Sequence, residues 1–321
     1  MIGPISNHNL ITCGVPQGSI LGPLLFILYI NDIIETSPLL RFILFADDTN
    51  LFYSNAKLAL LINTVNAGLD TLAVWFRANK LSLNVSKTNY IIFGRKKLPS
   101  IIPDILIDGV RVKRVDSTKF LGVHIDSLSS WKTHISNVCV KLSKSIGAIN
   151  RVKNLLPPST LLLLYHTMVY PYLTYNCIVW GGASSTNLNP ARVLQKRALR
   201  IITNSSYQLP SNPIFHKLNL LKFDDICKFL SLQFIAQFKL NLLPQACSYF
   251  FAIADINRRY NTRNVSYFVH QSCKTELRKN SIFIKGPNLW DLLPLTIQNS
   301  LCINEFNRTL KKHYIQSYGT V

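Results

Sequence analysis

Two runs of apolar, strand-forming residues enclose a pair of adjacent acids between Arg41 and Tyr53. The acids are Asp47 and Asp48, and the pattern predicts a β-hairpin that carries two carboxylates at its tip. Carboxylate oxygens are ligands that hard cations such as Mg²⁺ prefer, and a rigid hairpin would hold them in a fixed position. A pair of such ions can stabilise the attacking and leaving oxygens of a phosphoryl transfer. The alternative is a solvated turn, because Asp is common in turns.

Four further segments accompany the hairpin. A glutamine-glycine loop and an apolar stretch run from Gly14 to Phe26, about thirty residues before the acids. The segments Leu81–Thr88, Phe120–Asp126 and Leu194–Ile202 follow the hairpin. In this order, the segments resemble the reverse transcriptases of non-LTR (LINE-type) retrotransposons, and the resemblance spans nearly the whole chain. The sequence Ser-Ile-Leu-Gly-Pro-Leu-Leu-Phe after the loop is more similar to LINE elements than to the related maturases of group II introns.

The resemblance implies an α+β fold in two parts. Residues 1–127 would form the C-terminal part of a polymerase palm, an antiparallel sheet with helices. Residues 128–321 would form a mostly α-helical, basic thumb and C-terminal region. In this family a third catalytic aspartate lies upstream of the loop at Gly14, whereas only thirteen residues precede that loop here and none is acidic. We therefore expect a fragment that begins inside the palm, lacks the fingers and is inactive by itself.

The parent reaction that the resemblance implies is RNA-directed DNA synthesis. A primer 3′-hydroxyl attacks the α-phosphate of a deoxynucleotide and pyrophosphate leaves, with Mg²⁺ or Mn²⁺ as the cofactor. The partners would be an RNA template and a DNA primer, without a membrane, in an intracellular ribonucleoprotein of the nucleus and cytoplasm. Two other interpretations stay open. One is a non-enzymatic nucleic-acid-binding relic of a truncated element, and the other is a structural or interaction module.

The resemblance also assigns roles to single residues. Lys87 would lie near the departing pyrophosphate, where a lysine can donate a proton or neutralise charge; a solvated surface lysine is the alternative. Leu121 and Gly122 would form the turn that grips the primer, and the competing interpretation is a strand glycine packed against a helix. The candidate residues are Asp47, Asp48 and Lys87 for catalysis, with both acids as metal ligands; Gln17, Gly18 and Ala46 for the nucleotide; and Leu121, Gly122, Lys141, Lys144, Arg192, Lys196 and Arg200 for primer and template.

The formal net charge of +20 is spread unevenly along the chain. Residues 1–56 hold one basic residue and four acids, whereas residues 128–321 hold twenty-three basic residues and six acids. Between Ser127 and Phe223 there are eleven Lys and Arg residues and no acid. Solvated surfaces usually mix charges of both signs, so this asymmetry indicates a polyanionic partner, with nucleic acid first.

The seven cysteines are scattered and form no Cys-x-x-Cys pair. This pattern argues against a zinc site and against a disulfide framework, and it fits a reducing compartment. The first residues lack the basic start and the cleavable apolar run of a signal peptide. The strongest apolar stretch, Leu24–Ile30, is too short for a membrane span and predicts a buried helix.

The periodicity of apolar residues predicts the other elements. Lys57–Ala78 has an apolar stripe at helical spacing, and Asp108-Gly109 is a strong turn signal between two short strands. After Asp126 the chain becomes mostly helical. The expected elements are strands at Leu10–Cys13, Asn89–Phe93 and Phe120–Ile125; a hairpin at Ile105–Val115; helices from a cap at Ser19 to Ile34, then at Lys57–Ala78, Trp131–Val152, Pro157–Tyr170, Ala191–Ile202 and Phe223–Lys239; and a polar loop at Asn257–Phe268.

Overall fold

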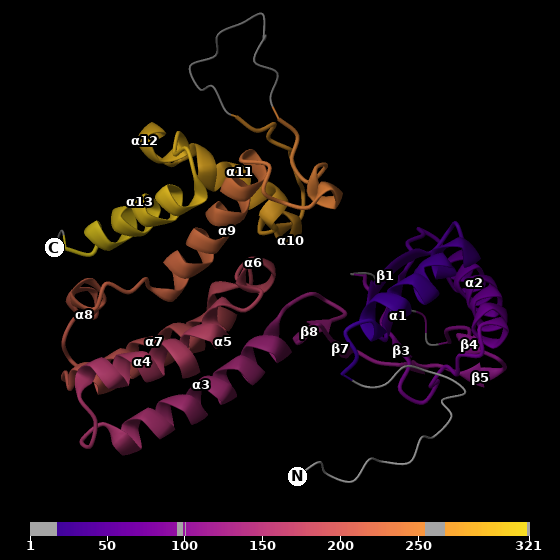
Figure 1. The fold of residues 1–321 in the computed structure, drawn as a ribbon, viewed down its shortest axis with the longest axis horizontal. Helices are drawn as coiled ribbons and strands as arrows, with labels where there is room; N and C mark the ends of the chain where they lie inside the picture. Colours follow the sequence, from indigo (N-terminus) through magenta and orange to yellow (C-terminus); the bar gives the residue numbers. More distant parts are fainter. Residues whose placement is uncertain (1–17, 95–98, 100, 254–266, 320–321) are drawn as a thin grey trace, which may run out of the picture. The chain divides into compact units, whose positions relative to one another are not determined.

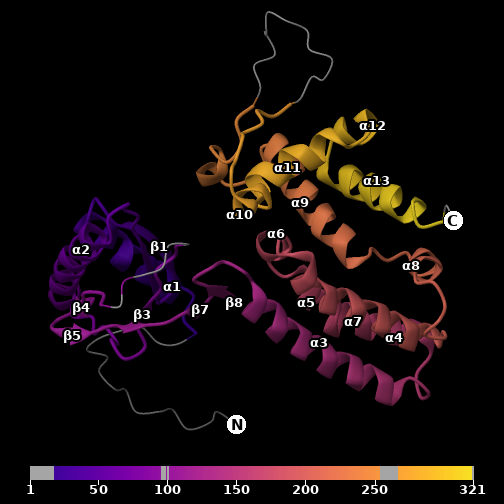
Figure 2. The same cartoon turned by 180° about the vertical axis from the view of Figure 1, so that it is seen from behind.

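The computed structural model describes residues 18–94, 99, 101–253 and 267–319. The chain divides into two compact units, Met1–Asp116 and Ser117–Val321. The first unit combines helices with short strands and the second is mostly helical, so the fold is mixed α+β (Figures 1 and 2). This boundary precedes the expected division at residue 127, because the hairpin over residues 117–126 belongs to the second unit.

In the first unit, the helix α2 (Leu58–Ala78) supplies more of the core than any other element, and its presence confirms the predicted helix. Its apolar stripe, which includes Ile62 and Leu69, is buried because these side chains recur on one face. The helix packs against the 3-10 helix η1 (Asn31–Thr36) and against β4 (Leu106–Ile107). By length and composition alone, α2 is apolar enough to cross a membrane, but its stripe is used in this packing.

The strands of the first unit form separate two-stranded ladders instead of the one antiparallel sheet that was expected. The hairpin signal at Asp108-Gly109 is confirmed, since both residues have the positive φ that a type I′ turn requires. The strand predicted at Asn89–Phe93 is shorter and pairs in parallel. The ladders in the described part of this unit are β1 (Arg41–Phe45) with β2 (Asp48–Phe52), β3 (Asn89–Tyr90) with β6 (Lys113–Arg114), and β4 with β5 (Val110–Arg111).

The helix after the glutamine-glycine loop differs most from the prediction. The helix α1 spans Gly22–Ile30 and continues as η1, and its N-cap is Leu21 instead of Ser19. No side chain caps this end; Pro23 presets the first turn and leaves one N–H fewer to satisfy. The prediction of a buried helix is also wrong: Leu28, for example, is 66% exposed. Within the described residues, α1 therefore presents much of its apolar sequence to solvent.

The second unit begins with a hairpin: the strand predicted at Phe120–Ile125 is interrupted at Leu121 and Gly122, where the resemblance implied a turn. Helices follow. The helix at Phe223–Lys239 has the predicted bounds. The helix predicted at Ala191–Ile202 begins six residues earlier, at Ser185, because Ser184 caps it by accepting a hydrogen bond from the Asn187 N–H at 3.3 Å. The elements are β7 (Ser117–Phe120), β8 (Val123–Asp126), α3 (Lys132–Val152), α4 (Pro158–Met168), α5 (Tyr170–Thr174), α6 (Cys177–Trp180), α7 (Ser185–Thr203), α8 (Asn212–Lys217), α9 (Phe223–Lys239), η2 (Gln245–Cys247), α10 (Glu276–Lys279), α11 (Ile282–Asp291), α12 (Leu295–Gln298) and α13 (Ile303–Gln316).

Two clusters of buried side chains form the core of this unit. One lies among α3, α4 and α7, and the other lies among α9, α11 and α13. Trp180 stacks on Phe223 with their ring centroids 5.6 Å apart. The strand predicted at Leu10–Cys13 and most of the loop predicted at Asn257–Phe268 lie outside the described residues.

One buried amide joins three helices. Gln195 on α7 is 1% exposed, and its Nε2 donates to the Tyr165 hydroxyl on α4 and to the Leu221 carbonyl, each at 3.0 Å. Its Oε1 accepts from the Phe223 N–H at 2.7 Å. That N–H belongs to the first turn of α9, where no partner exists inside the helix. Gln195 therefore satisfies the start of α9 and fixes it against α7.

We expect the Gln195→Leu variant to lose about 3 kcal/mol of unfolding free energy, because three buried polar groups lose a partner while the volume is nearly kept. Urea denaturation measures the loss, and hydrogen exchange should be faster in the first turn of α9. Arg197→Leu, at an exposed position of the same helix, is the control and should change stability by less than about 0.5 kcal/mol. Equal urea midpoints for both variants would contradict the role given to Gln195.

The hairpin β7–β8 is fastened to the start of α3. Asp126 accepts hydrogen bonds from the backbone N–H groups of Ser130 and Trp131, each at 2.9 Å. His134 Nδ1 accepts from the backbone N–H of His124 at 3.3 Å. His134 is 4% exposed, and its burial, followed by the nearby charges of His124 and Lys141, lowers its pKa to about 4. The folded protein therefore keeps this imidazole neutral, which is the form that can accept the bond.

This arrangement predicts a stability that depends on pH. The unfolded imidazole titrates near 6.5 and the folded one near 4, so between these values the unfolded state binds more protons. The contribution of His134 is fully present above about 6.5 and is lost as the pH falls through 4. Melting temperatures measured across this range should fall less steeply in His134→Gln, which cannot titrate, than in the parent or in the exposed control His216→Gln. Parallel curves for all three proteins would refute the prediction.

Candidate active site and nucleic-acid surface

The tip of the β1–β2 hairpin carries the two acids, as predicted. Phe45 and Asp48 form the last pair of the ladder, so Ala46 and Asp47 make a two-residue turn. Ala46 has a φ of +50°, at the turn position where a type II′ hairpin usually has glycine. A positive φ is uncommon for a residue with a Cβ, and such strain gathers at functional sites. The backbone conformation that presents the acids is therefore one that the local sequence does not favour.

The hairpin has one covered face and one open face. Phe42 and Leu44 pack against the core of the first unit, whereas Phe45 is 58% exposed. Asp47 and Asp48 are both exposed. This alternation follows from the two-residue period of a strand. The acids therefore stand at solvent beside exposed apolar surface, within reach of a ligand.

The donor set of the tip suits part of a metal site. Mg²⁺ is commonly held by one or two carboxylates and completes its shell with water and substrate phosphates. Asp47 and Asp48 could supply those carboxylates. The described residues contain no group of three or more His, Cys, Asp and Glu side chains placed to hold a metal ion. The pair thus fits one loosely held hard cation better than two.

The other residues expected near the nucleotide are only partly described. Gly18 has a φ of +85° and nothing within 4 Å of where a Cβ would lie, so backbone conformation, not crowding, favours glycine there. Gln17 lies outside the described residues. Lys87 follows a turn in which its N–H donates to the Asn84 carbonyl at 3.2 Å, and its side chain is exposed. In the described part of the chain Lys87 forms no ion pair, so no contact joins it to the acids.

Leu121 and Gly122 form the turn between β7 and β8. Their φ values are +44° and +82°, as in a type I′ turn. A Cβ on Gly122 would lie 3.1 Å from the ring of Tyr175, and the hydroxyl of Tyr175 donates to the Leu121 carbonyl at 2.6 Å. The alternative of a strand glycine is therefore wrong, because the residue lies in a turn. Turn geometry and close packing already favour glycine here, and contact with a primer stays a prediction.

The two candidate lysines on α3 are free for a partner. Lys141 and Lys144 are exposed, and Lys141 lies over the ring of Tyr172 at 5.5 Å from its centroid. Neither forms an ion pair with the described residues. Such lysines can reach phosphates without strain, because the long side chain keeps its ammonium group in water.

The two candidate arginines on α7 are bound within the protein. Arg192 is paired with Asp224 at 2.8 to 2.9 Å and also donates to the Ser185 carbonyl at 2.9 Å. Arg200 donates to the Leu209 carbonyl at 3.1 Å and lies over the ring of Tyr207. No local pattern indicates these contacts, since Asp224 is thirty-two residues away from Arg192. The geometry favours a structural role for both arginines over a phosphate contact.

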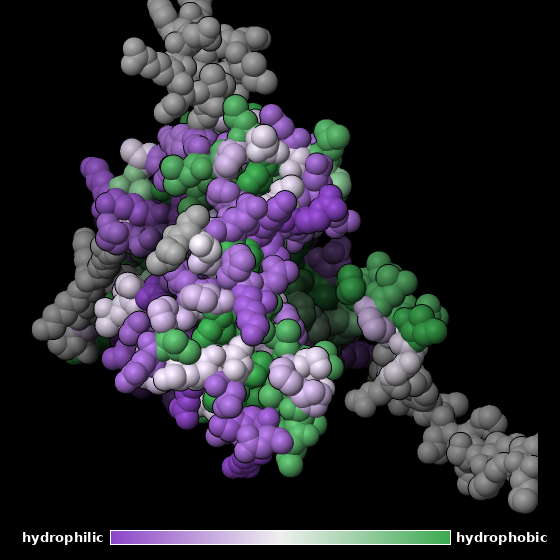
Figure 3. Space-filling model, turned by 90° about the vertical axis from the view of Figure 1, so that its left-hand side faces the viewer, coloured by the Kyte–Doolittle hydropathy of each residue, from purple (hydrophilic) through white to green (hydrophobic). Residues whose placement is uncertain are grey.

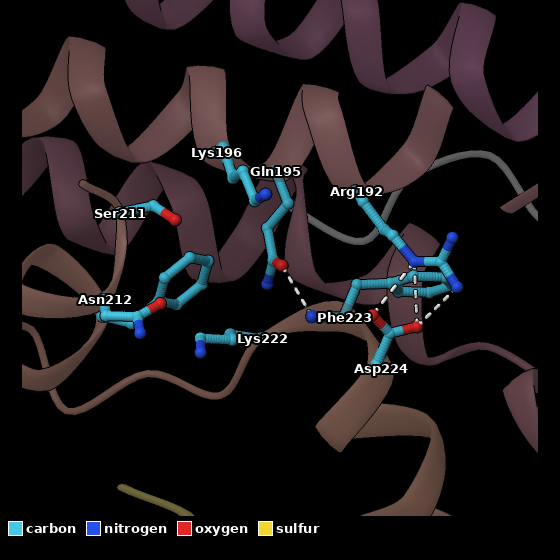
Figure 4. Close-up of a pocket in the computed structure, with 9 residues that line it drawn as sticks. Arg192, Gln195, Lys196, Ser211, Asn212, Lys222, Phe223 and Asp224 are labelled. Atoms are coloured by element: carbon cyan, nitrogen blue, oxygen red, sulfur yellow. Dashed lines mark hydrogen bonds and ion pairs between the residues drawn. The ribbon is translucent and has the colours of Figure 1, made fainter. Parts of the chain in front are cut away.

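A small pocket of about 110 Å³ lies among α7, α8 and α9 (Figure 4). Lys196, the exposed candidate of α7, lines it together with Lys222, Ser211 and Asn212, while the ion pair of Arg192 stands at the other end. Sequence reasoning missed Lys222, because nothing in its neighbourhood marks it as more than one basic residue among many. The end of the second unit where α8 lies is largely hydrophilic, with hydrophobic residues scattered over it (Figure 3).

Comparison with known proteins finds similar sequences, and the match includes the hairpin with the two acids. Residues 5–125 match the family "Reverse transcriptase (RNA-dependent DNA polymerase)". Among curated relatives, a probable RNA-directed DNA polymerase from transposon X-element of Drosophila melanogaster is 26% identical over 235 residues, which is 71% of this chain and 26% of that protein. A probable RNA-directed DNA polymerase from transposon BS of the same organism is 28% identical, over 64% of this chain and 24% of that protein.

A third relative is the RNA-directed DNA polymerase from mobile element jockey of Drosophila melanogaster, which is 23% identical over 74% of this chain and 26% of its own length. The chain thus spans about a quarter of the length of these relatives. No solved structure matches it significantly. The hairpin with its two acids lies inside the matched region. The chain is therefore similar to the RNA-directed DNA polymerases of non-LTR, LINE-type retrotransposons, and its residues 5–125 match the reverse transcriptase family.

Proposed function

We propose that residues 1–127 are the C-terminal part of a polymerase palm and residues 128–321 its helical thumb and C-terminal region. The observation that carries the proposal is the strained turn at Ala46, which presents Asp47 and Asp48 to solvent inside the matched region. Reverse transcriptases generally use a divalent metal. In this chain Asp47 and Asp48 would ligate Mg²⁺ or Mn²⁺, which would neutralise charge during nucleotidyl transfer.

The whole protein would use an RNA template and a DNA primer and would add deoxynucleotides to the primer. Gln17, Gly18 and Ala46 would face the nucleotide, and Lys87 would meet the departing pyrophosphate. The turn at Leu121 and Gly122 would support the primer. Such a protein would act as an intracellular ribonucleoprotein of the nucleus and cytoplasm. These assignments rest on the order of the segments and on the hairpin geometry.

The chain by itself should not polymerise. Two carboxylates leave a pair of divalent cations poorly neutralised, and the described residues offer no third acid beside them. The assay is extension of a DNA primer on an RNA template, with Mg²⁺ and separately with Mn²⁺. The paired variants are Asp47→Asn in the hairpin and Asp70→Asn at an exposed position of α2, outside the candidate site residues.

No template-dependent product is expected from the parent protein or from either variant. Extension by the parent and by Asp70→Asn that is lost in Asp47→Asn would overturn this expectation, and it would mean that the chain completes its own catalytic site. The alternative is a non-enzymatic nucleic-acid-binding relic of a truncated element. It makes the same prediction for this assay: no extension, together with binding of nucleic acid.

The second unit should bind RNA and DNA with little sequence preference, because lysine contacts to phosphates read no bases. Affinity should fall steeply as salt rises. Replacing Lys141, Lys144 and Lys196 by Gln should weaken binding to all sequences alike and reduce the slope of log affinity against log salt by up to about 2. Arg192 and Arg200 are not replaced. Loss of their internal contacts would destabilise the fold, and the effect on binding could not be told from the effect on stability.

Fluorescence anisotropy with labelled oligonucleotides measures the effect. The control removes the same charge from the first unit through Lys57→Gln, Lys80→Gln and Lys113→Gln, all at exposed positions. The control should keep most of the affinity. A flat salt titration, or equal losses in both triple variants, would show that the second unit is not the nucleic-acid surface.

A further inference from the structure

The pocket of Figure 4 gathers side-chain donors, two charged and two neutral, that form no ion pair or hydrogen bond with the described residues. Lys196 and Lys222 contribute two ammonium groups, and neither is paired with an acid among the described residues. Ser211 and Asn212 are half-buried, and the structure records no hydrogen bond for the hydroxyl of one or the carboxamide of the other within the described chain. Four side chains that can donate hydrogen bonds therefore surround one small space.

The nearby acids are already engaged. Asp224, which also lines the pocket, is held by Arg192 through both carboxylate oxygens at 2.9 Å. Asp225 accepts from the Tyr318 hydroxyl at 2.5 Å and is paired with Lys228 at 3.3 Å. Because these carboxylates are balanced inside the protein, the two lysines leave an excess of positive charge at the pocket.

Lys222 is held in place although it has no acidic partner. Its ammonium lies 4.1 Å from the centroid of the Tyr318 ring, and its backbone N–H donates to the hydroxyl of the same tyrosine at 3.2 Å. Burial lowers the pKa of Lys222, Asp225 and Asp224 raise it, and the positive charges of Lys196 and Lys228 lower it further. A cation kept partly desolvated and facing another cation is stabilised when an anion binds between them.

We propose that this pocket binds one phosphate group of a nucleic-acid strand through Lys196, Lys222, Ser211 and Asn212. A phosphate oxygen accepts hydrogen bonds from ammonium, hydroxyl and amide donors alike, and the volume of about 110 Å³ suits one such group. The buried rings of Phe215 and Phe223 form the apolar part of the pocket lining. The nucleic-acid source of the phosphate rests on the proposed function, whereas the chemistry of the pocket stands on its own donors.

Two lysines that hold the same phosphate should not act independently. The experiment uses the full chain and a labelled single-stranded RNA. Lys196→Gln and Lys222→Gln should each weaken binding. The dissociation constant of the double variant should exceed that of the more weakly binding single variant by at most about two-fold. The salt slope of the double variant should fall by about 0.7, which corresponds to one phosphate. The control is Lys144→Gln combined with Lys196→Gln, whose effects should multiply because the two residues would meet different phosphates.

A second measurement follows the pocket without relying on affinity. The pKa of Lys222, read by NMR of ¹³C-methylated lysines, should rise when the RNA is added. Inorganic phosphate is added in a separate titration. Lys222→Met, which keeps the apolar stem over Tyr318, replaces Lys222→Gln if thermal melting shows that the Gln variant is unfolded.

The outcomes separate this inference from the proposed function. If the parent binds RNA but the losses from Lys196→Gln and Lys222→Gln multiply, the pocket is refuted and the proposed function stands. If the parent binds no RNA at low salt, nucleic-acid binding by this chain is itself refuted. If inorganic phosphate raises the pKa of Lys222 and RNA does not, the pocket holds a free anion, and the assignment to a strand is overturned.

Discussion

The arrangement of the second unit depends on one amide. Gln195 lies at the centre of α7 and satisfies groups on both sides, the Tyr165 hydroxyl on α4 and the Phe223 N–H of α9. An apolar side chain could fill the same space but would leave buried donors and acceptors without partners, so the position needs both the shape and the chemistry of glutamine. Since Lys196 follows Gln195 and Lys222 precedes Phe223, the same amide also sets the two lysines of the pocket on facing elements.

The candidate basic residues in this unit fall into two classes that charge counting cannot separate. Arg192 and Arg200 use their several donors on a carboxylate and on carbonyl groups of the protein, which suits the fixed fork of a guanidinium. The exposed lysines Lys141, Lys144 and Lys196 have flexible stems and point charges. This division fits the chemistry of the two side chains. The rigid, planar guanidinium suits fixed contacts within the fold, whereas the flexible lysine ammonium can adjust its position to reach phosphates.

Prediction from sequence succeeded where a local pattern determines the structure. The hairpin at Asp47-Asp48, the type I′ turn at Asp108-Gly109 and the bounds of α9 each follow from neighbouring residues. It failed where the deciding partner is remote, as for Arg192 and Asp224. It also failed for α1, because an apolar run shows that a helix can be buried but not whether anything covers it. The acids of the candidate site were predictable, whereas the pocket at Lys222 depends on tertiary packing alone.

The uncovered face of α1 has a consequence for the heat capacity of unfolding. Apolar side chains raise the heat capacity of unfolding only if they are buried in the folded state and exposed to solvent in the unfolded state. Leu28 and its neighbours on α1 are exposed to solvent in both states, so they contribute little to the heat capacity of unfolding. The first unit should therefore have a flatter curve of stability against temperature, and a broader melting transition, than its apolar composition would suggest. A partner that covers α1 would restore the missing heat capacity and sharpen the transition.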